Sequence, residues 1–245
     1  MATADIEFFF DPVCPFAWIT SRWIEKVREQ TEYSVEWRFI SLRILNKDKD
    51  YATDFPPEYE HGHTAGLRML RVCAAVREEL GNEPIGPLYA ALSSATFDAE
   101  PDGPEEAYRA EIGTASMIEQ ALVTAGLPTH FAAAADEAKW DEIIDTETEV
   151  ALSRSGRDVG TPIITFRPPD GLSFFGPVIS RIPDDADAVP LWDAVTTLAA
   201  YPGFAEMKRS LREKPQLRAF GELSDSPEFE DWQGGARAAH LPENN

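Results

Sequence analysis

The stretch IEFFFDPVCPFAW, residues 6–18, decides the fold, because it joins a buried strand to a helix through a turn that carries a cysteine. Residues 6–10 form a short, mostly apolar run rich in Phe, and Asp11-Pro12 ends it, as expected of a buried strand followed by a turn. Pro15 suits the first position of a helix, where its missing N–H is not needed. Apolar residues then recur at helical spacing at Ile19, Trp23, Ile24 and Val27. The sequence therefore places Cys14 at a helix N-terminus.

The rest of the chain supplies the other elements. Apolar and polar residues alternate over 35–39, which predicts a second strand, and a strand-helix-strand unit closes as a right-handed parallel crossover. A long helical stretch follows, with three predicted helices around residues 69–80, 118–125 and 140–151. Residues 163–166 and 172–175 predict a hairpin, and Pro190 to Ala200 predict a closing helix stopped by Pro202.

This order predicts an α/β protein with a thioredoxin-like fold and an inserted all-helical domain. We expect residues 1–55 and 156–220 to form a discontinuous thioredoxin-like domain, with the helical insertion at 56–155. Residues 221–245 are rich in Asp, Glu, Ser, Pro and Gly and poor in aliphatic side chains. They predict an acidic C-terminal tail that wraps loosely or is disordered and carries no chemistry.

The composition narrows the class of protein. The 245 residues are 43% hydrophobic, which is enough for a buried core. A formal net charge of −21 repels phosphate backbones and anionic membrane surfaces, so we expect neither nucleic acid nor membrane as a partner. The sequence has no run of roughly 20 apolar residues and no leader with a cleavage site. It contains two cysteines. Together these features favour a soluble protein in a reducing compartment, the cytoplasm.

The two cysteines need separate interpretations. Cysteine reacts as the thiolate, and a helix N-terminus lowers the thiol pKa through its unpaired N–H groups and macrodipole, so Cys14 is a candidate nucleophile. The alternative is a small core residue at a strand-to-helix turn. Cys73 falls on an apolar helix face beside Met69, Val72 and Val76, where desolvation raises the thiol pKa, and we expect it in the core.

Other polar groups predict structure rather than chemistry. His61-Gly-His63 lacks a Cys or carboxylate at a recognisable ligand spacing, so we expect a solvated loop and no metal site. The acidic clusters at 98–106 and 136–149 lack an associated His or a Gly-rich calcium loop, which indicates solubilising surface. Asp11 is expected to end the first strand and to bond the backbone of the turn.

Three motifs carry a resemblance to a known family. They are Asp11-Pro-Val-Cys14-Pro-Phe-Ala-Trp18, Gly160-Thr161-Pro162 and Phe174-Phe-Gly-Pro177. Their combination resembles the DsbA-like branch of the thioredoxin superfamily, and within it is most similar to the mycothiol-dependent nitroreductase family. The likeness continues through residues 19–23 and 41–46 to the helix around Trp192, and so covers nearly the whole chain up to about residue 215.

The resemblance implies a role for each motif. Cys14 would be the attacking cysteine, and Pro162 would be a cis proline facing it. The backbone of Thr161 would receive the substrate thiol as an extra strand. The other candidates for binding a thiol or substrate are Pro15, Phe16, Trp18 and Gly160.

The chain departs from the family at Ala17, where typical members of the branch place the second cysteine of Cys-Pro-x-Cys. Without that sulfur no disulfide forms within the motif, so the thiol that resolves a mixed disulfide must come from elsewhere. Cys73 is one candidate, but its predicted place on an apolar helix face argues against ready access. A low-molecular-weight thiol such as mycothiol is the better candidate for this co-substrate.

These observations favour a monothiol oxidoreductase that acts through Cys14 on a small-molecule thiol or disulfide, including mycothiol-linked reduction of nitro compounds or mixed disulfides. One alternative is an enzyme resembling the kappa-class glutathione transferases and isomerases. Another is a non-catalytic thioredoxin-fold protein that binds a peptide or small ligand. No Gly-x-Gly-x-x-Gly fingerprint follows a strand, so we expect no bound cofactor. The oligomeric state stays open, with a homodimer as one option.

Overall fold

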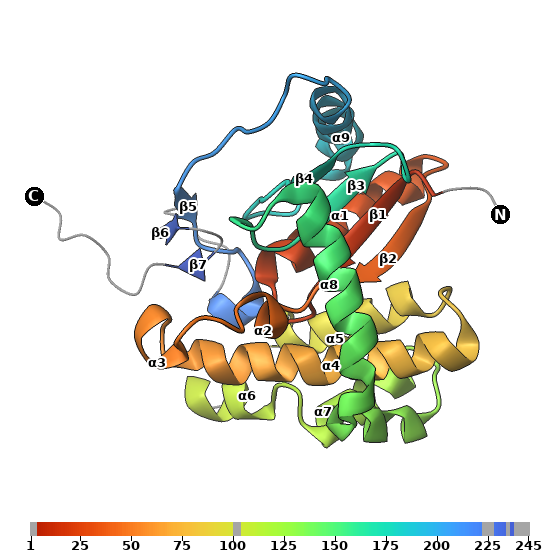
Figure 1. Ribbon diagram of the computed structural model, residues 1–245, viewed down its shortest axis with the longest axis vertical. Helices are drawn as coiled ribbons and strands as arrows, with labels where there is room; N and C mark the ends of the chain where they lie inside the picture. Colours follow the sequence, from red (N-terminus) through yellow and green to blue (C-terminus); the bar gives the residue numbers. More distant parts are fainter. Residues whose placement is uncertain (1–3, 100–103, 222–227, 234–235, 238–245) are drawn as a thin grey trace, which may run out of the picture.

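The computed structural model describes residues 4–99, 104–221, 228–233 and 236–237. A four-stranded sheet in the order β2-β1-β3-β4 organises this part of the chain (Figure 1). β1 (Ile6–Phe10) runs parallel to β2 (Val35–Phe39) and antiparallel to β3 (Ile163–Phe166), which pairs with β4 (Ser173–Phe175). The predicted strand-helix-strand unit and the later hairpin are therefore present, and the predicted α/β class is confirmed.

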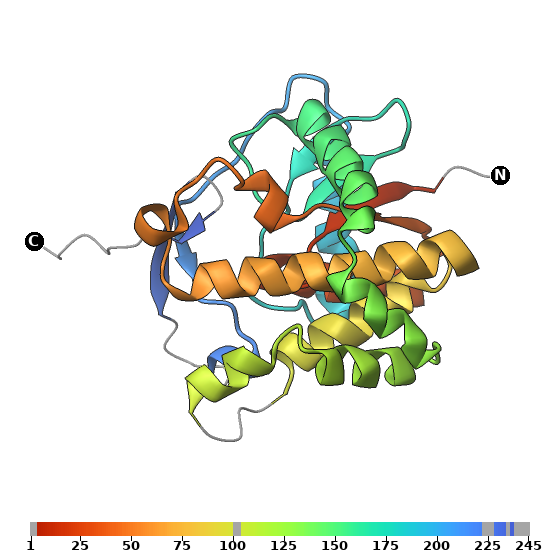
Figure 2. The same cartoon turned by 60° about the horizontal axis from the view of Figure 1, so that its bottom comes forward.

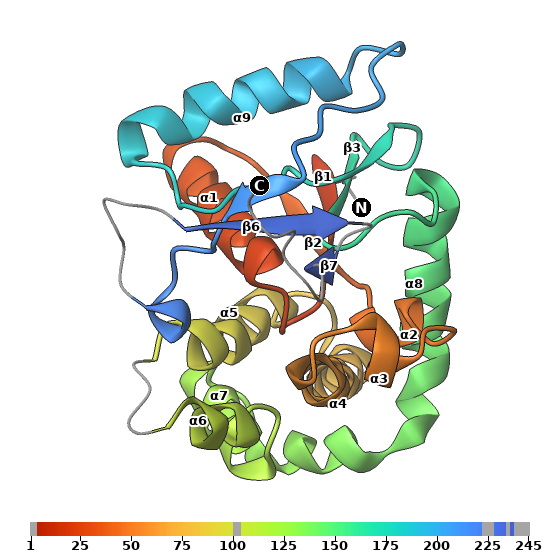
Figure 3. The same cartoon turned by 90° about the vertical axis from the view of Figure 1, so that its left-hand side faces the viewer.

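The two faces of the sheet follow from the alternation along β1. Phe8 and Phe10 belong to the main core together with residues of α1 (Pro15–Gln30), α5 (Ile85–Phe97) and α9 (Asp185–Ala199). Phe9 points to the other face, where it packs in a smaller cluster with Ala151 and Leu152 of α8 (Asp141–Ser155). Figure 3 shows α1 and α8 on opposite sides of the sheet. Because helices cover both faces, β1 and β3 are buried along their length.

The helical part lies between β2 and β3 in the sequence and begins with the short α2 (Leu42–Leu45) and α3 (Tyr51–Asp54). It continues with α4 (Glu58–Leu80), α5, α6 (Glu105–Glu111), α7 (Ala115–Thr124), η1 (Thr129–Asp136), η2 (Ala138–Trp140) and α8. In Figure 2 the yellow and yellow-green helices lie along one side of the long orange α4, and the green α8 lies on the other side. The three predicted helices correspond to α4, α7 and α8; the domain boundaries 1–55, 56–155 and 156–220 stay predictions.

Two predictions about these helices are wrong. α9 begins at Asp185 rather than at Pro190, so the proline lies in the second turn of the helix. Proline is best tolerated in the first turn of a helix, which is why the sequence favours a start at Pro190, but the acidic Asp185 and Asp187 form the first turn here and Pro190 lies inside the helix. The acidic cluster at 136–149 is not all surface either. Glu147 of α8 is buried and accepts hydrogen bonds from Arg38, Arg77 and the backbone N–H of Phe39, because α8 packs on the sheet.

The C-terminal region forms a second small sheet instead of a loose tail. β5 (Leu211–Glu213), β6 (Phe229–Gln233) and β7 (Ala236–Arg237) are antiparallel neighbours in that order, with η3 (Arg218–Phe220) between β5 and β6. Figure 3 shows β6 crossing in front of α1. The prediction of an unstructured tail is thus wrong for β6 and β7, because Trp232 gains a buried site against the main core. The rest of the predicted tail, 222–227, 234–235 and 238–245, lies outside the described residues.

Candidate active site

Cys14 caps the N-terminus of α1. β1 ends at Phe10, and the turn closes when the N–H of Cys14 donates to the carbonyl of Asp11 at 3.0 Å. Pro15 occupies the first helical position, as predicted, and the N–H of Ala17 donates to Cys14 Sγ at 3.5 Å. The sulfur therefore takes the place that a serine or aspartate oxygen takes at an ordinary N-cap.

The loop before β3 forms the other side of the site, opposite the N-terminus of α1. Cys14 Sγ donates to the backbone carbonyl of Thr161 at 3.2 Å, across 147 positions of sequence. The Thr161 hydroxyl donates to the carbonyl of Phe9 at 3.3 Å, which ties this loop to the end of β1. The resemblance implied a cis bond at Pro162, and the Thr161–Pro162 peptide bond is cis. Gly160, Thr161 and Pro162 are all buried beside the sheet.

The other predicted site residues lie in two places. Phe16 lies on the side of α1 that meets the C-terminal sheet, with its ring 4.9 Å from that of Trp232. Trp18 is directed toward α5, where its indole N–H donates to Asp98 at 3.0 Å and the Arg22 guanidinium lies over its ring. Trp18 is thus part of the packing between α1 and α5.

Burial controls the chemistry of Cys14. Its residue surface is only 6% exposed, and this desolvation raises the pKa of the thiol to about 12. The N–H of Ala17 and the charge of Arg212 lower that pKa, while the charge of Asp11 raises it. The helix N-terminus lowers the Cys14 pKa as expected, but desolvation raises it by more. Cys14 is held as a thiol, which agrees with its donating a hydrogen bond to Thr161.

Asp11 takes the structural role expected of it. Its two oxygens accept hydrogen bonds from the backbone N–H groups of Val13 at 3.1 Å and Leu42 at 2.7 Å. The carboxyl is fully buried, and desolvation raises its pKa to about 7 despite these two bonds, which lower it. Asp11 therefore joins the turn before Cys14 to the start of α2.

Cys73 lies in the core, as predicted. It is fully buried on α4, desolvation raises the pKa of its thiol to about 12, and it forms no disulfide with Cys14. Unlike Cys14, Cys73 lies in the interior of α4, away from a helix N-terminus and from Thr161, so it lacks the contacts that define the candidate site.

The prediction of a solvated loop at His61-Gly-His63 is wrong. Both histidines lie in the first turns of α4, and His63 is buried among the rings of Tyr51, Phe55 and Tyr59. His63 Nδ1 is 2.8 Å from the Tyr51 hydroxyl, and burial lowers the His63 pKa to about 4. This histidine is a neutral packing residue. Among the described residues, no group of three His, Cys, Asp or Glu side chains is arranged to hold a metal ion.

The sequence does not indicate the residues that cover Phe16, two positions after Cys14. Arg212 of β5 lies over the ring of Phe16, and Trp232 of β6 packs against the same ring. The available signal was Trp232 within an otherwise polar segment, since a large aromatic side chain in such a segment indicates a buried contact, although the nearby Phe229 is exposed. Periodicity alone does not reveal which core Trp232 joins.

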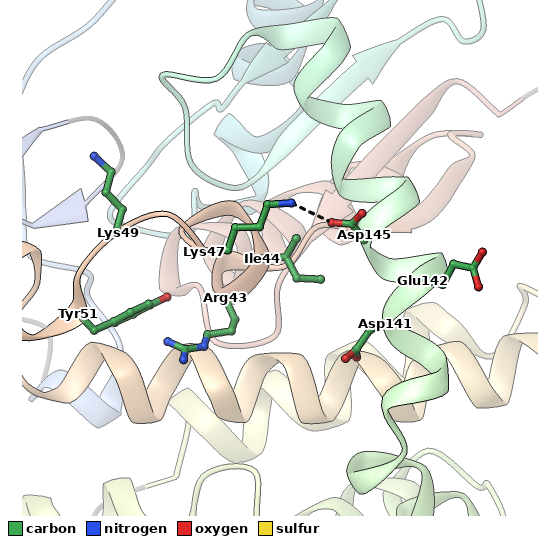
Figure 4. Close-up of a pocket in the computed structure, with 8 residues that line it drawn as sticks. All are labelled: Arg43, Ile44, Lys47, Lys49, Tyr51, Asp141, Glu142 and Asp145. Carbon is green, nitrogen blue, oxygen red and sulfur yellow. Dashed lines mark ion pairs between the residues drawn. The ribbon is translucent and has the colours of Figure 1, made fainter.

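A separate surface hollow lies between the loop after α2 and the start of α8 (Figure 4). Basic and acidic side chains face each other there, including the ion pair of Lys47 and Asp145 at 3.6 Å. Asp141, also at its edge, is held by Arg71 of α4. None of the residues predicted for the active site lines this hollow.

The described residues form a thioredoxin-like fold, in which Cys14 at the start of α1 contacts Thr161 in the loop before β3. The fold is shared with the crystal structure of the probable DsbA oxidoreductase SCO1869 from Streptomyces coelicolor, which has 14% sequence identity and a TM-score of 0.51. That match covers 86% of this chain and 95% of the other.

The chain belongs to the Rv2466c-like family, described as mycothiol-dependent nitroreductase Rv2466c, whose pattern matches residues 13–209. It is therefore a thiol-dependent oxidoreductase, as predicted. It is also similar to the uncharacterized protein Rv2286c of Mycobacterium tuberculosis (strain ATCC 25618 / H37Rv), with 28% identity over 208 residues, covering 83% of this chain and 81% of that protein.

Proposed function

We propose that this protein is a monothiol oxidoreductase in which Cys14 exchanges with the disulfide of a low-molecular-weight thiol, with mycothiol as the preferred partner. The observation that carries the proposal is the position of Cys14 at the N-cap of α1, where its Sγ lies 3.2 Å from the Thr161 carbonyl oxygen. Ala17 stands where typical members of the branch have a second cysteine. Family membership supports mycothiol as the co-substrate.

The exchange has two steps. Cys14 attacks one sulfur of a disulfide; a Cys14–sulfur bond forms, the original disulfide bond breaks, and the Cys14 proton ends on the leaving thiol. A second free thiol then attacks the mixed disulfide, forms a new small-molecule disulfide and returns Cys14 to the thiol form. The external thiol is needed because Ala17 provides no internal sulfur and Cys73 is buried in the core.

The same cysteine supports reduction of a nitro compound, the activity named for the family. Two thiols that become one disulfide release two electrons and two protons, which convert a nitro group to a nitroso group and water. Cys14 and one small thiol would supply this pair, and a further thiol would regenerate Cys14. We further expect Thr161 and Pro162 to align the partner, no bound cofactor, and a cytoplasmic location where such thiols are kept reduced.

Intact-protein mass after incubation with oxidised mycothiol, and separately with oxidised glutathione, tests the proposal. Wild type and Cys73→Ser should gain a single adduct that free thiol removes, and Cys14→Ser should gain none. Retention of the adduct in Cys14→Ser, or its absence from wild type, would refute the assignment. Because mycothiol is the proposed partner, it should form the adduct faster than glutathione does.

Ala17→Cys provides a matched variant for the monothiol step. The N–H of residue 17 already donates to Cys14 Sγ, so a cysteine there lies next to the reacting sulfur. We expect this variant to lose the adduct without added thiol, by forming a disulfide between residues 14 and 17. If wild type also releases its adduct without added thiol, the single-cysteine mechanism is wrong.

A further inference from the structure

Arg212 of β5 lies between the first turn of α1 and β4, two segments that border the Cys14 site. Its guanidinium carbon is 5.6 Å from the centre of the Phe16 ring, 5.9 Å from that of Phe175 and 5.4 Å from that of Trp232. Phe16 is two residues after Cys14 in the first turn of α1. Phe175 of β4 pairs with Ile163, the residue after Pro162. Arg212 is therefore held by aromatic side chains from both segments that contribute to the site.

This cation is half-buried and, among the described residues, forms no ion pair. That is unexpected in a chain with 43 acidic and 22 basic side chains. The neighbouring Glu213 pairs with Arg181 instead. Desolvation lowers the pKa of Arg212, and the rings of Phe16, Phe175 and Trp232 surround its guanidinium. The unpaired Arg212 guanidinium, next to the first turn of α1, is well suited to stabilise the Cys14 thiolate, an anion that forms only when Cys14 loses its proton.

The charged and titratable groups around Cys14 come from three segments. Asp11, in the turn before α1, raises the Cys14 pKa, and Arg212 lowers it. Tyr89 of α5 also interacts with Cys14, but burial raises the pKa of its hydroxyl, which stays neutral. Arg212 therefore provides the positive charge that opposes Asp11 when Cys14 loses its proton.

We propose that Arg212 is a positioning residue that stabilises the thiolate form of Cys14, acting from the C-terminal sheet across the ring of Phe16. The proposal rests on the proposed function, because it concerns the cysteine that attacks the disulfide. It extends the active site to β5, beyond the segments 14–18 and 160–162 that the sequence indicates. The C-terminal sheet thus contributes charge to the site as well as covering it.

Alkylation of Cys14 by iodoacetamide across a range of pH tests this role, with the labelled peptide identified by mass. Arg212→Met keeps an apolar side chain among the rings but removes the charge. We expect it to slow alkylation at neutral pH by about tenfold and to move the midpoint of the pH profile upward. Arg212→Lys should restore most of the rate, because it restores the charge. Arg209→Gln is the matched control, since Arg209 is exposed and lies over the ring of Phe229; it should leave the profile unchanged.

Equal or faster alkylation in Arg212→Met, with an unchanged midpoint, would overturn the proposal and reduce Arg212 to a cover over Cys14. Circular dichroism checks that each variant is folded. If Arg212→Met unfolds, a comparison of Arg212→Lys with Arg212→Gln asks the same question. Alkylation needs no disulfide substrate, so this result stands apart from the adduct experiment. A protein that shows the pH shift but forms no adduct would refute the proposed exchange and leave the role of Arg212 intact.

Discussion

Gly66 of α4 is where a single methyl group should test the packing behind the active site. A β-carbon built at Gly66 would lie 2.4 Å from Asp11 Oδ1 and 2.7 Å from Val13 Cγ2. Both atoms belong to the turn that leads into Cys14, and Asp11 is held in place by its bonds to the N–H groups of Val13 and Leu42. Gly66→Ala therefore forces the turn and α4 apart.

Two opposing effects set the size of the change. Replacing glycine by alanine inside a helix normally stabilises it by up to about 1 kcal/mol. Overpacking a buried site normally costs about 1–3 kcal/mol, because the neighbours must shift. Gly62 lies one turn earlier in the same helix, and a β-carbon there meets nothing within 4 Å. Gly62→Ala thus measures the helix effect alone, and Gly66→Ala adds the overlap.

We expect the free energy of unfolding of Gly66→Ala to lie about 1–3 kcal/mol below that of Gly62→Ala. Urea unfolding at one pH, with equal slopes for the two variants, measures this difference. Alkylation of Cys14 should also change in Gly66→Ala and stay the same in Gly62→Ala, because only the first displaces the turn. If the two variants are equally stable, the β-carbon at residue 66 does not overlap Asp11 and Val13, and the reasoning from the close packing of α4 against this turn is refuted.

Two further predictions concern buried charges. Glu147→Gln should lower the free energy of unfolding by about 3–5 kcal/mol, because it removes the buried carboxylate that pairs with Arg77 and one of the carboxylates that pair with Arg38, which keeps its contacts with Glu7 and Glu36. Glu149→Gln, which loses a surface pair with Arg157, should cost no more than about 1 kcal/mol. Equal losses in urea unfolding would contradict this account. Asp11 has a folded-state pKa of about 7, above its unfolded value near 4, so its contribution to stability is present below about pH 4 and is lost as pH rises through 7. The stability advantage of wild type over Asp11→Asn should therefore shrink between about pH 4 and pH 7, and an advantage that is constant over this range would show that Asp11 does not titrate there.

Much of the fold follows from local patterns. The alternation of 35–39, the apolar run of 6–10 and the helical spacing after Pro15 each reflect one element, and each element forms as predicted. The errors arise where a local pattern fits more than one environment. His63 looks like part of a solvated loop in the sequence, yet Tyr51 and two aromatic neighbours enclose it. Glu147 looks like surface, yet α8 presents it to two arginines.

The sequence by itself determined that Cys14 stands at the start of a helix, that Ala17 leaves it without a neighbouring sulfur, and that Cys73 lies on an apolar helix face. These are local properties, set by the residues within one or two turns of each cysteine. Only the tertiary structure decided the electrostatic state of Cys14, because desolvation depends on the segments that cover it. Thr161, Arg212 and Trp232 come from distant parts of the chain, and their packing keeps the Cys14 thiol protonated while placing a cation beside it.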